Sequence, residues 1–162
     1  MPRTHFVHII PGILILLISA ACGGDGGPVS PGSGTSFQGQ WDGTWQRTSC
    51  TETGGAQGIA CSQPPGMSGG LRLTLSQSGT EVQGTLEFAI FIVPVTGTVN
   101  QGTLSLSGQA HSQTATGRIT AWSTTRSGNT MSGSFTFSIV ADNPADGSST
   151  VTVSLQNVTR TA

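Results

Sequence analysis

The sequence predicts an all-β domain that forms an eight-stranded antiparallel up-and-down β-barrel, with a two-sheet β-sandwich as the alternative. Three observations lead to this prediction. From about Phe37 onward, apolar and polar residues alternate with a period of two, without a helical pattern. Short turns that contain glycine separate the alternating segments. There are eight such segments, which is enough for a sheet to close on itself and remove its exposed edges.

The expected strands follow one another through short connections, which favours an antiparallel meander. They cover residues 39–48, 70–77, 81–93, 95–99, 103–110, 114–125, 130–140 and 149–159. The turn and break signals between them are Ser78-Gly79, Pro94, Asn100-Gln101-Gly102, Ser127-Gly128-Asn129 and the polar loop 142–148. A longer loop, which holds Cys50 and Cys61, joins the first strand to the second.

Alternation places one face of each strand toward the core. The bulky side chains expected inside are Leu73, Leu75, Leu86, Phe88, Phe135 and Phe137. Glycines share these faces at Gly84, Gly117 and Gly133, so a small apolar cavity and a core filled by side chains are both open. If a ligand enters, the residues expected to contact it are Leu73, Phe88, Phe135 and Phe137.

The third strand is expected to continue as far as Val93, with Ile90 and Ile92 facing inward. Phe91, Val93 and Trp122 would then face outward. Such an exposed apolar patch often marks a partner or membrane contact, although a β-bulge would turn these residues inward.

Residues 1–21 have the three regions of an export signal. A basic start precedes an apolar run too short to span a bilayer, and the small residues Ser19, Ala20 and Ala21 lead to Cys22. This stretch resembles a bacterial lipoprotein signal peptide, although Ser19 stands where these signals commonly have Leu. The resemblance implies cleavage after Ala21 and acylation of Cys22, and two or three acyl chains make a stable membrane anchor. An ordinary secretory signal is the alternative.

Residues 22–36 are expected to be a flexible tether, because they are mostly Gly, Ser and Pro and cannot bury apolar surface. Fourteen residues reach at most about 50 Å when fully extended. The third segment, residues 37–162, is the barrel domain. The lipoprotein resemblance places it outside the cytoplasm, anchored in the bacterial cell envelope, and in the outer membrane if the cell is Gram-negative.

Two cysteines, Cys50 and Cys61, remain after Cys22 is assigned to the lipid. Disulfides persist in exported proteins, so this pair predicts one disulfide bond; two reduced thiols are the alternative. No metal site is expected, because His111 is the single histidine beyond the signal and a zinc ion takes about four ligands.

Charge and composition argue against several functions. Beyond residue 21 the chain has five arginines against seven carboxylates, a net charge of −2, so no nucleic-acid partner is expected. We expect no cofactor and no catalysis: His111 lies in a turn without a second histidine or a nucleophile elbow. Asp142 and Asp146 fit a hairpin loop better than a calcium loop. Glu81 and Glu87 are both expected to point outward.

The motif Gly39-Gln40-Trp41 resembles the Gly-x-Trp of lipocalins and avidins, and Arg160 lies where those families place an arginine across that tryptophan. The resemblance implies that Gly39, Trp41 and Arg160 close one end of the barrel, with a guanidinium over an indole. A second copy of the motif, Gly43-Thr44-Trp45, lies on the same face. Biotin binding of the avidin type is disfavoured, because those sites use tyrosine and this chain has none.

These observations predict a lipid-anchored, lipocalin-like binding protein for a small apolar ligand or an envelope partner, without catalysis. The alternative is a structural or interaction lipoprotein with a filled core and no ligand. An enzyme is a third class, and it would have to depend on His111.

Overall fold

The structure is a computed structural model that describes residues 35–56, 61, 64 and 66–161. The proposed signal peptide, its cleavage site at Ala21, the lipid-attachment residue Cys22 and most of the tether lie outside these residues.

The chain forms a closed barrel of eight antiparallel strands in sequence order. The strands are β1 (Gly39–Thr53), β2 (Ser68–Ser78), β3 (Glu81–Phe88), β4 (Phe91–Asn100), β5 (Thr103–His111), β6 (Ala115–Ser127), β7 (Thr130–Ala141) and β8 (Ser148–Arg160). Two short 3₁₀ turns, η1 (Gly54–Ala56) and η2 (Pro144–Asp146), follow β1 and precede β8. The barrel prediction is therefore confirmed.

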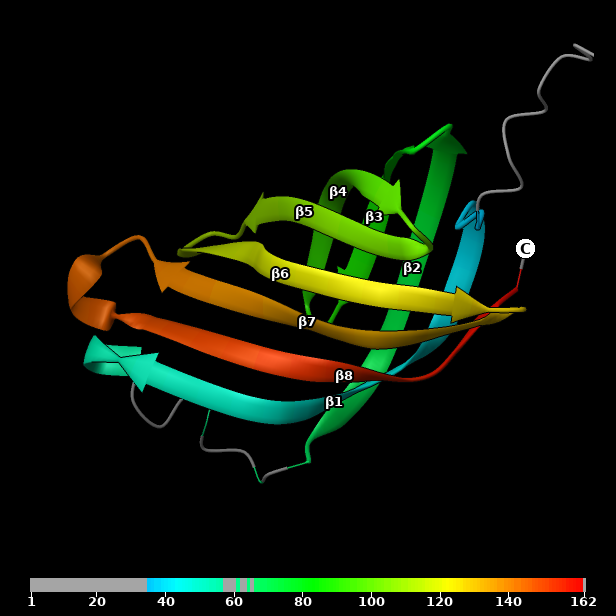
Figure 1. Ribbon diagram of the computed structural model, residues 1–162. Helices are drawn as coiled ribbons and strands as arrows, with labels where there is room; N and C mark the ends of the chain where they lie inside the picture. The colour runs from blue at the N-terminus through cyan, green and yellow to red at the C-terminus, as the bar shows by residue number, and fades with distance from the viewer. Residues whose placement is uncertain (1–34, 57–60, 62–63, 65, 162) are drawn as a thin grey trace, which may run out of the picture.

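Closure depends on the ladder between β1 and β8, which are distant in sequence. β1 pairs with β8 from Trp41 opposite Arg160 to Thr53 opposite Ser148, with two register shifts. β5 to β8 and the far part of β1 run side by side, and β2 to β4 cross behind them (Figure 1). The β-sandwich alternative is excluded, because β8 has a partner on both sides.

Because the topology is up-and-down, the connections alternate between two ends. The hairpin end holds the β2–β3, β4–β5 and β6–β7 turns, together with Phe37 and Thr161. The loop end holds the β1–β2, β3–β4, β5–β6 and β7–β8 connections. The two 3₁₀ turns, η1 and η2, both lie at the loop end.

The predicted inward alternation is confirmed for most strands. The fully buried large side chains include Leu73, Leu86, Phe135 and Phe137, and Phe88 is 5% exposed. Glu81 and Glu87 are exposed, as expected. Burying alternate apolar residues is the main driving force that fixes the register of these strands.

The prediction is wrong in one place, the boundary between β3 and β4. The chain reverses at Ala89 and Ile90 rather than at Pro94, and Phe88 pairs with Phe91. A two-residue turn at this point exchanges the two faces of the residues that follow. Side chains expected inside are therefore exposed, Ile90 at 88% and Ile92 at 69%.

The residues expected to form the outward apolar patch are instead turned toward the core. Val93 is fully buried, Trp122 is 6% exposed, and Phe91 is half-buried against the core. Pro94 lies inside β4 at an outward position, and β4 pairs with β5 only from Val95 onward. The N–H that proline lacks would face β5 where β4 and β5 are not paired, so no ladder hydrogen bond is lost.

Candidate functional site

The candidate site is the interior of the barrel at the loop end, where strand register brings polar residues of β1 onto the inner face. Arg47 lies opposite Val153, and Cys50 lies opposite Val151. Residues directly opposite in an antiparallel ladder point to the same side, and Val153 is fully buried in the core. Glu52 lies opposite the buried Ser149 in the same way. Arg47, Cys50 and Glu52 therefore share the inner side of β1.

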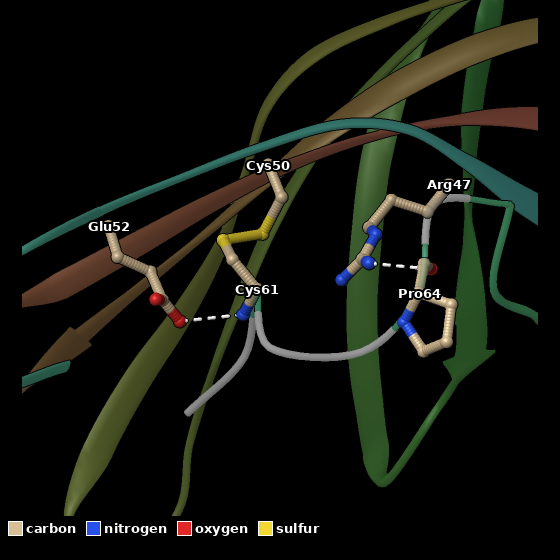
Figure 2. The surroundings of a disulfide bond; sticks show 5 residues. All are labelled: Arg47, Cys50, Glu52, Cys61 and Pro64. Carbon is tan, nitrogen blue, oxygen red and sulfur yellow. Dashed lines mark hydrogen bonds between the residues drawn. A yellow bond between two sulfur atoms is a disulfide. The ribbon is translucent and has the colours of Figure 1, made fainter. Parts of the chain in front are cut away.

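These three side chains hold the β1–β2 connection at the loop end (Figure 2). Cys50 and Cys61 form a disulfide with their Cα atoms 5.6 Å apart, which confirms the predicted bond. The Glu52 carboxylate accepts a hydrogen bond from the Cys61 N–H at 2.7 Å. The Arg47 guanidinium donates to the Pro64 carbonyl oxygen at 2.8 Å. Cys50 belongs to β1 rather than to the loop, because β1 continues to Thr53 alongside β8.

Apolar side chains from four strands lie at the same end of the barrel. Phe91 (β4), Ala110 (β5), Ile139 (β7) and Val151 (β8) are partly buried hydrophobics that pack against the core. We call these four residues the apolar rim. They leave apolar surface in contact with water at the end of the barrel that holds the β1–β2 connection, and exposed apolar surface of this kind is typical of a binding surface.

Beneath the apolar rim lies a layer of aromatic rings, which we call the aromatic floor: Trp45, Phe88, Trp122, Phe135 and Phe137. Phe88 is central, with ring centroids 5.0 Å from Trp45, 5.0 Å from Phe135 and 5.3 Å from Phe137. Phe91 of the rim lies 5.0 Å from Phe137. The structure thus brings three of the four predicted ligand-contacting residues together. The fourth, Leu73, lies opposite Trp41, nearer the hairpin end.

Of the three glycines expected inside the barrel, Gly84 and Gly117 lie on inner faces and have no room for a side chain, whereas Gly133 is exposed, which corrects the prediction. A Cβ on Gly117 would lie 2.5 Å from the Phe137 ring. A Cβ on Gly84 would lie 1.8 Å from the carbonyl oxygen of Thr74, and one on Gly133 would lie 2.2 Å from that of Ser123. These glycines permit close approach of neighbouring backbones and of one aromatic ring.

The tryptophans differ in how their indole N–H groups are satisfied. Trp41 donates to the Phe37 carbonyl at 2.8 Å, and Trp122 donates to the Thr124 hydroxyl at 3.0 Å. Trp45 is 4% exposed, and its N–H has no hydrogen-bond acceptor among the described residues. The second Gly-x-Trp motif marks Trp45 in the sequence, but nothing in the sequence shows that its N–H is unpaired.

The hairpin end is closed as the resemblance implied, but by a different arginine. Trp41 is fully buried, and the guanidinium carbon of Arg126 lies 5.6 Å from its ring centroid. Arg126 also donates to the Ser36 and Gly128 carbonyls. Arg160 is instead the register partner of Trp41 across the β1–β8 ladder. Arg126 comes from β6 and reaches the ring because its strand ends at the same end of the barrel.

A shallow groove of about 350 Å³ lies on the outer wall, lined by a row of charged residues and by Gly70 and Ala89. Arg72 Nε lies 2.8 Å from Asp42 Oδ1, and Arg72 Nη1 lies 4.0 Å from Glu87 Oε2. Hydrogen bonds from Gln40, Arg72 and Thr161 lower the pKa of Asp42 to about 2. The hydrogen bonds that Asp42 accepts therefore favour its ionised form.

His111 lies on the outside of the loop end, at the end of β5. Its Nδ1 is 3.1 Å from the Thr116 hydroxyl, and its Nε2 is 3.7 Å from Asp142 Oδ2. The imidazole is 63% exposed and the Asp142 carboxylate is 46% exposed. Both side chains therefore lie in contact with water beside the β5–β6 connection.

Two absences hold for the part of the chain that the structure describes. It contains no group of three or more His, Cys, Asp or Glu residues arranged to hold a metal ion. It also contains no helix long and apolar enough to cross a bilayer.

The strand order and the core define a closed, eight-stranded antiparallel β-barrel with an apolar interior. This architecture is compatible with a lipocalin-like fold. Comparison with protein-family models, with curated proteins and with solved structures finds no match to this chain.

Proposed function

We propose that this protein is a lipid-anchored, extracytoplasmic binding protein, and that its barrel takes a small apolar molecule at the loop end without chemical conversion. The observation that carries the proposal is the apolar rim above the aromatic floor. Apolar and aromatic linings with few polar groups are typical of small-molecule sites, which occur at the mouths of β-barrels. Binding requires the ligand to pack among Phe91, Ala110, Ile139 and Val151.

The binding test uses N-phenyl-1-naphthylamine, a neutral apolar dye whose fluorescence rises out of water. Ile139 and Val140 are adjacent in β7, but Ile139 belongs to the apolar rim whereas Val140 faces outward and is 51% exposed. We expect Ile139→Ser to weaken dye binding by about three- to tenfold, as the loss of a buried aliphatic contact predicts. Val140→Ser is the matched control and is expected to bind the dye like the wild type. Absence of dye binding to the wild type, or equal weakening in both variants, would contradict the proposal.

The anchoring part of the proposal rests on the sequence pattern that ends at Cys22, and the disulfide supports an oxidising, extracytoplasmic compartment. Residues 35–37 pack at the hairpin end, where Phe37 is fully buried and its N–H donates to Gln77 Oε1 at 2.7 Å. The tether therefore leaves the barrel at the end opposite the proposed binding site.

Lipid attachment is tested by labelling cells with a fatty acid that carries a detectable tag. We expect the wild type to incorporate the label, and Cys22→Ser to lose it and to appear in the soluble fraction. Continued labelling of Cys22→Ser would show that the lipid is attached elsewhere or not through this pathway.

A second candidate function is an interaction lipoprotein with a filled core and no ligand. Two observations favour it: the inner glycines are occupied, and the β3–β4 turn exposes the apolar side chains of Ile90 and Ile92. Native mass spectrometry of protein taken from its own membrane separates the two candidates. A small molecule that co-purifies reproducibly supports the first, and its absence across preparations, together with normal binding of a protein partner, supports the second.

A further inference from the structure

The unpaired indole N–H of Trp45 is a costly feature to leave inside a protein. A buried donor without an acceptor has lost its hydrogen bonds to water and gained none in return, whereas a satisfied donor has replaced them. Trp45 is 4% exposed, and its N–H has no acceptor among the described residues. Trp41 and Trp122 lie in the same interior, and each has an acceptor within 3.0 Å. Burial in the barrel therefore does not by itself explain why the Trp45 N–H lacks an acceptor.

The position of Trp45 connects this donor to the candidate site. Trp45 precedes Arg47 on the inner side of β1, and its ring is tilted against Phe88 with centroids 5.0 Å apart. The edge of the indole that carries Nε1 lies over Gly69, where an added Cβ would be 2.9 Å from that nitrogen. Gly69 is the second residue of β2, at the loop end. The N–H edge thus faces the first residues of β2, at the same end of the barrel as the apolar rim.

The aromatic floor around this donor is hydrocarbon apart from the indole nitrogens, and the nitrogen of Trp122 is already paired. A ligand that adds an acceptor gains a hydrogen bond there. A ligand that adds a hydroxyl brings a further donor, for which the floor offers no acceptor. The chemistry of the floor therefore selects an oxygen that accepts and does not donate.

We propose that the Trp45 indole N–H is the polar recognition element of the barrel, and that it donates a hydrogen bond to a carbonyl-type oxygen on an otherwise apolar ligand. The assignment rests on the proposed function, because it requires that a ligand reach the floor. The route passes Phe91, which is the half-buried ring next to Phe137.

The test compares two probes of nearly the same shape, 2-nonanone and 2-methyl-1-nonene, in which a C=CH₂ group replaces the C=O group. Their dissociation constants are measured by competition with N-phenyl-1-naphthylamine for the wild type, Trp45→Phe and Trp41→Phe. Trp41→Phe is the matched control, since it removes an indole N–H that already donates to Phe37 at the hairpin end. Circular dichroism and urea unfolding establish that each variant is folded.

We expect the preference for the ketone over the alkene to fall about three- to tenfold in Trp45→Phe, which is the range of one net hydrogen bond. The preference should be unchanged in Trp41→Phe. If both probes bind the wild type and the preference survives in Trp45→Phe, the assignment of Trp45 is overturned and the binding function stands. If neither probe nor the dye binds the wild type, the proposed function falls, and this assignment falls with it.

A second measurement does not depend on the folding of a variant. The chain has three tryptophans, so a ¹⁵N-labelled sample gives three indole N–H signals in NMR spectra. Addition of 2-nonanone should move the Trp45 proton signal downfield, as a new hydrogen bond requires, whereas 2-methyl-1-nonene should not. A Trp45 signal that responds equally to both probes would overturn the assignment.

Discussion

Replacement of Arg126 by methionine tests the closure of the hairpin end. Methionine keeps the apolar stem but removes the guanidinium, which lies 5.6 Å from the Trp41 ring centroid and donates to the Ser36 and Gly128 carbonyls. The cation–π contact contributes about 0.5 to 2 kcal/mol, and a hydrogen bond from a charged donor contributes a further 1.5 kcal/mol or so. We therefore expect Arg126→Met to lower the free energy of unfolding by about 2 to 3.5 kcal/mol.

Arg160→Met is the matched comparison, because Arg160 is the residue that the sequence motif selected and it lies beside Trp41 in the β1–β8 ladder. Its effect should stay near 0.5 kcal/mol, which is usual for a substitution that breaks no buried contact. Urea unfolding followed by tryptophan fluorescence measures both values. In thermal unfolding, Arg126→Met should lower Tm by about 5 to 12 °C. Equal losses in the two variants, or a larger loss for Arg160→Met, would refute the assignment of Arg126 as the closing residue.

Three further predictions follow from the same structure. Replacing Cys50 and Cys61 together by serine should lower the free energy of unfolding in urea by about 2 to 3 kcal/mol, since cross-linking two cysteines 11 residues apart stabilises the fold by that amount. Thiol labelling of both cysteines in the unreduced, denatured wild type would contradict the disulfide. Gly84→Ala should lower the free energy of unfolding by about 1 to 3 kcal/mol or more, because the new Cβ would lie 1.8 Å from the Thr74 carbonyl oxygen. Gly70→Ala should be nearly neutral, because no atom lies within 4 Å of its Cβ position. Similar shifts of Tm in the two variants would contradict the packing. Since the folded pKa of Asp42 is lowered from 3.8 to about 2, the stability that it contributes is present above pH 4 and is lost as the pH falls toward 2. The Asp42 side chain is about a third exposed, so its contribution to the free energy of unfolding should be below about 1 kcal/mol. That contribution should disappear in Asp42→Asn. An acid unfolding curve that is the same in Asp42→Asn as in the wild type would contradict the role of Asp42.

The candidate site was only partly predictable. Phe88, Phe135 and Phe137 follow from period-two alternation, which assigns each residue to a face without knowledge of its neighbours. Arg47 and Glu52 were not predicted. Arg47 could have been, because it is in phase with the buried Trp41 and Trp45. Glu52 could not, because it faces inward only through a shift of the β1–β8 register between Arg47 and Ser49. The unpaired state of Trp45 depends on which acceptors other strands bring within reach, and that is also a property of the assembled barrel.

Local patterning was sufficient for the all-β class, the number of strands and the Cys50–Cys61 bond, because alternation, turn residues and cysteine pairing act over short stretches or through few alternatives. The barrel was preferred to a β-sandwich partly through the resemblance of the Gly-x-Trp motif, and its closure depends on the long-range pairing of β1 with β8. The assignments of Cys22 and of a ligand remain predictions. The position of the β3–β4 turn could not be predicted from the sequence. Ala89 adopts a positive φ of 52° there, and no glycine, asparagine or aspartate marks the turn. The pairing of Arg126 rather than Arg160 with the Trp41 ring was equally hidden, because it joins β1 to β6, two strands that are not neighbours in the barrel. Contacts across the interior depend on the closed shape of the whole sheet, and only the tertiary structure contains that information.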